Sequence, residues 1–267
     1  MDYLVLATIG VVMGVFGGLL GIGGSVIMIP ALVFAFGENQ HLYQASAMIC
    51  SFFVGASATI VHRSEKVLMW DVLKWLIPAA AVGSVIGVAI SNSSVFAGEN
   101  SYLLARILGG FMVYVVVYNC LKFGGSDGGA DGFDISGVRR SAGLSIVCGL
   151  LSGVPAGLLG LGGGVLLVPT QQLFLRLPLK RAISNSAAAI ALLTILAAVY
   201  KTATLPQHGI AAIEALKISA VVIPGAIIGA FLGGRGVHRL PSRVVRIVFI
   251  VLMALACYKL LTVSPGV

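Results

Sequence analysis

Charged side chains are scarce in this chain: 10% of its 267 residues are Asp, Glu, Lys or Arg, and 58% are hydrophobic. Soluble domains carry about 25% charged residues, so the composition excludes an ordinary soluble domain and indicates an integral membrane protein. Only nine residues are acidic, and all of them lie in or near expected loops. Because cation and proton carriers use intramembrane carboxylates, this distribution argues against a metal or sodium transporter.

Other absences narrow the function further. The four cysteines share no metal-ligand spacing and are expected to be packing residues, so no metal site is predicted. No Ser/His pair occurs at membrane depth, which argues against an enzyme. The glycines lack the setting of a dinucleotide fingerprint, and no cofactor is expected. The net charge of +8 comes from basic residues dispersed among short loops, which is typical of topology signals rather than of nucleic-acid binding.

Long apolar runs dominate the remaining sequence. A helix needs about 20 residues to cross the hydrocarbon core. Strand-like alternation is absent, so the runs are expected to be helices. They cover residues 3–36, 45–61, 72–90, 102–121, 142–175, 182–200, 211–233 and 244–262.

A glycine-rich string occurs twice inside these runs. It reads GGLLGIGGSVIMIP at residues 17–30 and AGLLGLGGGVLLVP at residues 156–169. Each glycine weakens a helix interior by about 1 kcal/mol relative to alanine, so a helix is expected to break at both places. Broken helices at matching positions of two halves point to the binding site of a transporter.

The match between the halves continues beyond the strings, because Ala45 pairs with Ala182 and Arg106 with Arg246. Residues 1–122 and 139–267 are therefore interpreted as two repeats. Residues 123–138 are rich in glycine and aspartate and are expected to form a flexible polar linker between them.

The relative orientation of the repeats depends on whether the chain turns back at the glycines. If residues 3–36 cross once, the repeats are parallel and the basic residues divide almost evenly between the two sides. If the chain turns back at 17–24 and 157–164, each half has five segments and the repeats are inverted. Thirteen basic residues then fall on one side, which favours the turn, and four on the other: Arg106, Lys201, Lys217 and Lys259.

The predicted fold class is therefore an all-α integral membrane protein with two inverted five-segment repeats. Eight spans are long, and two helices after the breaks, over 25–36 and 164–175, are short or re-entrant. The charge distribution predicts a cytoplasmic linker and periplasmic termini in a multi-pass protein of the cell inner membrane. The sequence leaves the oligomeric state open.

The breaks supply the first candidate binding residues. A helix that restarts after a break presents unpaired N–H groups and the positive end of its dipole, which a small anion can satisfy. Close helix packing is the alternative role of such glycines. The predicted substrate-binding residues at the breaks are Gly23, Gly24, Ser25, Gly162, Gly163 and Gly164.

Uncharged polar side chains near the second break add further candidates, with interhelical hydrogen bonding as the alternative. They are Gln171, Gln172, Asn185 and Ser186. Met48 and Ile49 occupy the matching positions of the first half, where Ser46 and Ser51 are weaker candidates. Arg106 could attract an anion or snorkel to the headgroups. The four histidines, His41, His62, His208 and His238, lie beside loops and are expected to be solvated.

With both glycine strings, each followed by an Ala-x-x-x-Ser-like helix start, the chain resembles the sulfite exporter TauE/SafE family over nearly its whole length. The resemblance implies a secondary transporter, with export favoured, of small sulfur-containing or organic anions such as sulfite or sulfonates like sulfoacetate. The departure at Met48 and Ile49 leaves the first-half contacts open. The expected partners are this anion and the lipid bilayer, and no nucleic acid. The alternatives are an anion channel and a membrane scaffold without transport.

Overall fold

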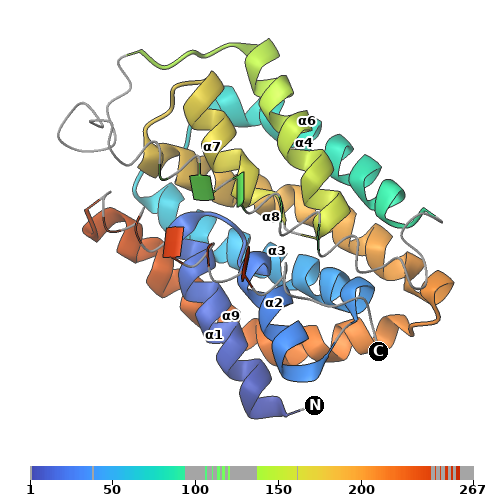
Figure 1. Cartoon of the computed structure of the whole chain (residues 1–267). Helices are drawn as coiled ribbons and strands as arrows, with labels where there is room; N and C mark the ends of the chain where they lie inside the picture. Colours follow the sequence, from blue (N-terminus) through green and yellow to red (C-terminus); the bar gives the residue numbers. More distant parts are fainter. Residues whose placement is uncertain are drawn as a thin grey trace.

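The structure is a computed structural model. It describes residues 2–37, 39–93, 137–160 and 162–241, together with single positions between 106 and 120 and between 244 and 258. The described ranges contain helices and no strand (Figure 1). The elements are α1 (Tyr3–Leu20), α2 (Ser25–Phe36), α3 (Gln40–Ser64), α4 (Trp70–Ser91), α6 (Ala142–Leu159), α7 (Gly164–Phe174), α8 (Leu179–Thr204), η3 (Leu205–His208) and α9 (Ala212–Arg239).

Six segments in the described part of the chain are long and apolar enough to cross a membrane. They are α1, α3, α4, α6, α8 extended by η3, and α9, so the chain is a multi-pass membrane protein. The two other long spans predicted, over 102–121 and 244–262, lie largely outside the described residues, as does most of the linker 123–138. The helices α2 and α7 are short, with 12 and 11 residues.

Both predicted breaks are confirmed. The helix α1 ends at Leu20, where Gly21 adopts a left-handed conformation with φ 63°, and α2 begins at Ser25. The second break has the same form, since Gly160 follows α6 with φ 73°. Only glycine adopts this conformation readily, which explains why the helices end there. A Cβ added at Gly17 would lie 2.8 Å from the Gly24 nitrogen, so the chain turns back on itself.

Other glycines of α1 and α6 serve helix packing, which is the alternative role. Successive small residues of α1 contact the backbone of α9 in the same order along both helices, so the two helices run parallel. The helices α6 and α4 form a second parallel pair of this kind. The absence of side chains lets the backbones approach closely. The contacts are Gly10 with Val222, Gly14 with Ala226, Gly18 with Ala230, Gly149 with Leu76 and Gly153 with Ala80.

The helices α3 and α8 form the centre of the bundle, because each packs against the other and against a long helix of the opposite half. Their central position overturns one expectation about the histidines. His41 and His62 on α3 are 6% and 0% exposed, so the prediction that they are solvated is wrong. Position along the chain placed them near loops, but the neighbouring helices cover both ends of α3. His208 is partly exposed.

Candidate functional site

The two glycine breaks meet at Ser51 in the middle of α3. The Ser51 hydroxyl donates a 2.7 Å hydrogen bond to the carbonyl of Gly23 and also contacts the hydroxyl of Ser25. A Cβ added at Gly162 would lie 3.2 Å from Ser51 Cβ and Oγ. At the same place, the Cα of Gly164 lies against the backbone of Ile22. The two breaks, which lie about half of the chain apart in the sequence, therefore meet at one place. We call this place the break junction, and it is formed by Gly23, Ser25, Ser51, Gly162 and Gly164.

The helix α8 closes another side of the break junction. A Cβ added at Gly23 would lie 3.1 Å from Ile190 Cγ2, and one added at Gly162 would lie 3.4 Å from Thr194 Cγ2. The Thr194 hydroxyl donates to the carbonyl of Ile190 at 2.6 Å. The surroundings are thus apolar apart from hydroxyl groups and main-chain atoms, and in low dielectric such dipoles act strongly.

Two helix N-termini converge on this junction. The helices α2 and α7 begin directly after the breaks, with Gly24 and Gly163 as N-caps and no side-chain hydrogen bond to either cap. The first-turn N–H groups of a helix have no intrahelical partner, and the helix dipole adds a partial positive charge. A small anion is the ligand that satisfies both features.

Ser186 joins the candidate glycines at this junction. Its hydroxyl donates a 2.6 Å hydrogen bond to the carbonyl of Gly21, which links the second half to the first break. The structure therefore brings together, from the predicted set, the break residues Gly23, Gly24, Ser25, Gly162, Gly163 and Gly164 with Ser186. Ser51, a weaker candidate from the sequence, is a polar side chain that contacts both breaks.

The other polar candidates lie towards one end of the bundle. We call it the Met69 end, formed by residues 65–69 and 175–178. Asn185 Oδ1 accepts a 2.9 Å hydrogen bond from the Met69 nitrogen. Gln171 is seven residues beyond Gly164, about 10 Å along the helix, and its Nε2 donates to the Leu167 carbonyl at 3.0 Å. Gln172 beside it is buried. Asn185 Nδ2 and Gln171 Oε1 are buried and lack hydrogen-bond partners within the described residues.

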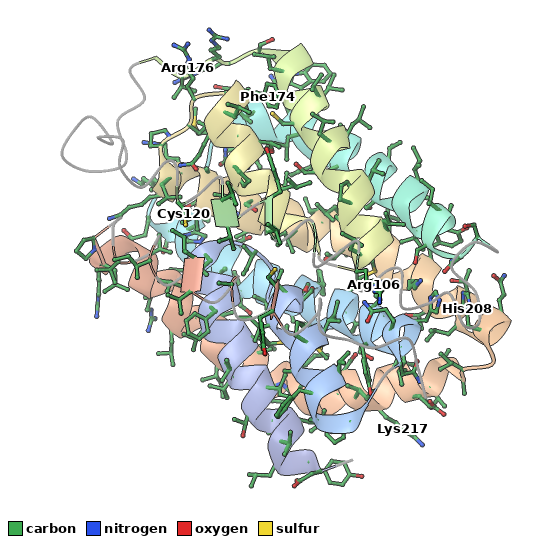
Figure 2. The ribbon with its side chains drawn as sticks, in the orientation of Figure 1. Arg106, Cys120, Phe174, Arg176, His208 and Lys217 are labelled. Atoms are coloured by element: carbon green, nitrogen blue, oxygen red, sulfur yellow. The ribbon has the colours of Figure 1, made fainter. Side chains whose placement is uncertain are left out.

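Arg106 is exposed, and most of the residues next to it lie outside the described part of the chain. Figure 2 shows it on the side of the molecule that carries His208 and Lys217, whereas Arg176 and Phe174 lie on the opposite side of that view.

Sequence reasoning missed a buried ionisable residue at the other end of α8. Lys201 is 0% exposed, and its Nζ is 2.9 Å from His41 Nδ1, 2.8 Å from Ser91 Oγ and 2.9 Å from Asn92 Oδ1. We call these four residues the Lys201 cluster. Lys201 follows the apolar run 182–200 directly, and that position was the available signal in the sequence. Among the described residues, no group of three His, Cys, Asp or Glu side chains is placed to hold a metal ion.

Comparison with known proteins gives a family match over most of the chain. The model of the family described as "Sulfite exporter TauE/SafE" matches residues 6–260. The chain is 25% identical over 280 residues to the "Probable membrane transporter protein YunE" of Bacillus subtilis, covering 96% of this chain and 97% of that protein. No solved structure matches the chain.

A second relative is considerably longer than this chain. The "Probable membrane transporter protein MamO" of Magnetospirillum gryphiswaldense is 28% identical over 284 residues, which covers 98% of this chain and 45% of that protein. The chain therefore spans less than half the length of this relative.

Proposed function

Because this chain belongs to the sulfite exporter TauE/SafE family, we propose that it is a secondary transporter of small sulfur-containing or organic anions, such as sulfite or a sulfonate like sulfoacetate. The observation that carries the proposal is the break junction. Two helix N-termini, α2 and α7, point their positive ends to the place where Ser51 contacts both breaks. Export is the proposed direction.

We propose that the two halves are inverted repeats. The pairing α1 with α9 has the same form as the pairing α6 with α4, with the halves exchanged, and both pairs run parallel. The chain reverses between α1 and α2, and again between α2 and α3 and between α3 and α4. Thus α4 runs antiparallel to α1. Because α6 is parallel to α4, α6 is antiparallel to α1, its counterpart in the first half. This geometry supports inverted repeats of the kind that secondary transporters use.

The charges at the helix ends support a cytoplasmic Met69 end in the inner membrane. Short connections there carry many of the basic residues, and cytoplasmic loops are enriched in lysine and arginine. Both termini are then periplasmic, as is the end that carries the Lys201 cluster. The basic residues at the Met69 end are Arg63, Lys66, Lys74, Arg176, Lys180 and Arg181.

Hydrogen bonds at both ends of α8 suggest how access to the break junction alternates. We call these hydrogen bonds the α8 ties. At the Met69 end, Asn185 accepts from the Met69 nitrogen, and Arg181 donates to the Val67 carbonyl at 3.3 Å. At the other end, Lys201 donates to Ser91 of α4. Each tie joins α8 of the second half to the first half. We propose that breaking the ties at one end at a time exposes the bound anion to one side of the membrane.

Flux measurements on the purified full-length protein in proteoliposomes test the proposal. Uptake of labelled sulfite or sulfoacetate should saturate with concentration and should be stimulated by unlabelled anion on the opposite side. A single-vesicle conductance that does not saturate would identify an anion channel instead. A protein that moves none of these anions, and whose thermal stability no anion changes, would contradict transport and favour a scaffold.

A further inference from the structure

Lys201 is an ionisable side chain that has no acidic hydrogen-bond partner among the described residues. It is fully buried in a membrane-spanning helix, and the three acceptors around its Nζ are an imidazole, a hydroxyl and an amide. None of these is acidic. Removal from water opposes the charge of a buried ammonium, whereas the three acceptors favour it. An ionisable residue at such a place in a membrane protein is a functional candidate, and a proton is a ligand that it can bind without a cavity.

The described groups that hydrogen-bond to Lys201 carry no negative charge. From α3 the titratable neighbour is His41, and from η3 it is His208, whose ring stacks on His41 with 3.8 Å between centroids. The helix α4 contributes only the neutral groups of Ser91 and Asn92, and Asn92 also donates to Thr204 at 2.8 Å. An anion that enters this half of the bundle would therefore stabilise the ammonium form of Lys201 through its negative charge.

A chain of polar groups joins Lys201 to the second glycine break. The Ser91 hydroxyl accepts from Lys201 and lies 3.4 Å from Gln44 Oε1, to which it donates. Gln44 Nε2 lies 3.4 Å from the Leu158 carbonyl, and a Cβ added at Gly160 would lie 2.6 Å from Gln44 Cγ. The polar chain that starts at Lys201 therefore ends at Leu158 and Gly160, two residues before Gly162 of the break junction.

We propose that Lys201 binds a proton whose uptake is linked to anion binding at the break junction. The inference rests on the proposed function. When the junction is occupied, the negative charge favours the ammonium, which donates to His41, Ser91 and Asn92. When the junction empties, the Nζ–H bond that points to His41 breaks, His41 Nδ1 takes this proton while its Nε2 releases one towards solvent on the side of the partly exposed His208, and Lys201 remains as the neutral amine. Since such linkage is reciprocal, protonation of Lys201 must tighten anion binding by the same factor.

Calorimetry on the purified full-length protein tests the linkage without any substitution. Sulfoacetate is the probe, because its two acidic groups stay ionised from about pH 6 to about pH 9. Titrations in buffers with different heats of ionisation should show uptake of a fraction of a proton, up to one, for each anion bound. The dissociation constant should decrease about 5- to 150-fold between the high and the low pH. Tight binding without proton uptake would overturn the proposal and leave the proposed function intact.

Variants at Lys201 separate a proton site from a structural tie. Lys201→Gln should bind sulfoacetate weakly at every pH. Lys201→Arg, which keeps a permanent charge, should bind it tightly at every pH without proton uptake. Lys217→Gln changes an exposed lysine of α9 and should retain the wild-type pH dependence. A wild-type pH dependence in Lys201→Gln would refute the assignment. Failure of the wild-type protein to bind any sulfonate or sulfite would refute the proposed function and, with it, this inference.

Discussion

The Ser51 hydroxyl donates a 2.7 Å hydrogen bond to the carbonyl of Gly23, and the same side chain lies against Gly162 of the other half. One residue of α3 therefore contacts the breaks of both repeats. A hydroxyl can donate to only one acceptor at a time. An anion that binds at the junction would compete with the Gly23 carbonyl for this proton, and Ser51 would then sense whether the junction is occupied.

Replacement of Ser51 by alanine should weaken anion binding. The change removes a donor that can reach a charged ligand, which corresponds to about 1.5–3 kcal/mol of binding free energy. Isothermal titration with sulfite measures the effect. Ser84→Ala is the matched control, because Ser84 is also buried but its hydroxyl bonds to Ala81 of its own helix at 2.8 Å. Equal affinity in the two variants would remove Ser51 from the site.

Asn185 offers a test of polar recognition outside the breaks. Its Oδ1 is occupied by the Met69 nitrogen, whereas its Nδ2 has no hydrogen-bond partner within the described residues. Asn185→Asp retains the acceptor for Met69 but replaces the donor with a negative charge, so anion binding should fall at least tenfold while the protein still folds. Gln172→Leu should also weaken binding, by about 1–3 kcal/mol. Wild-type affinity in Asn185→Asp would show that this side chain serves only to hold Met69.

Arg106 should act through long-range attraction rather than direct contact, because its described position is exposed. Exposed charges are screened beyond about 8–10 Å in physiological salt. Arg106→Gln should therefore slow anion uptake into proteoliposomes at low ionic strength and have little effect at high ionic strength. The Asn185 and Gln172 effects should persist in salt. A loss of affinity in Arg106→Gln that salt does not change would make this arginine a direct ligand.

Topology is testable by labelling single cysteines with an impermeant reagent, on a background without the four native cysteines. Positions in the linker 126–134 should react only after the cells are permeabilised. Positions next to the N-terminus and in the connection between α2 and α3 should react in intact cells. Reaction of the linker from outside would contradict the inverted repeats and the sidedness of both ends of α8.

The local sequence predicts where the helices break, but it does not predict which residues pack against the breaks. Glycine conformation and helix propensity act within a few residues, so the end of α1 at Leu20 and the start of α2 at Ser25 could be predicted. The meeting of Gly23 with Gly162 depends on how two halves pack. The sequence indicates the repeat, but it does not show that α3 carries Ser51 between the breaks.

Burial was the property that sequence position predicted least well. Lys201 and His41 lie at helix ends, where side chains are commonly solvated or snorkel to the headgroups. Here η3 and the end of α4 cover them, and the ring of His208 stacks on His41. Which helix end is covered is a tertiary property, and hydropathy along a single segment contains no information about it.

Alanine substitution at the break glycines tests the central claim most directly. Gly23 and Gly162 have φ 80° and 65°, and an added Cβ would approach Ser51 where the two breaks meet. Gly209→Ala is the matched control, since Gly209 has φ 72° but no atom within 4 Å of an added Cβ. All three variants carry the same backbone strain, about 1–2 kcal/mol.

The measurement is counterflow of labelled sulfite in proteoliposomes that contain equal amounts of folded protein. Gly23→Ala and Gly162→Ala should each lower the initial rate at least tenfold, whereas Gly209→Ala should stay within about twofold of the wild-type rate. Such a difference would place the anion at the break junction. Wild-type counterflow in both break variants would contradict the account, because the glycines would then serve only helix packing and the anion would bind elsewhere.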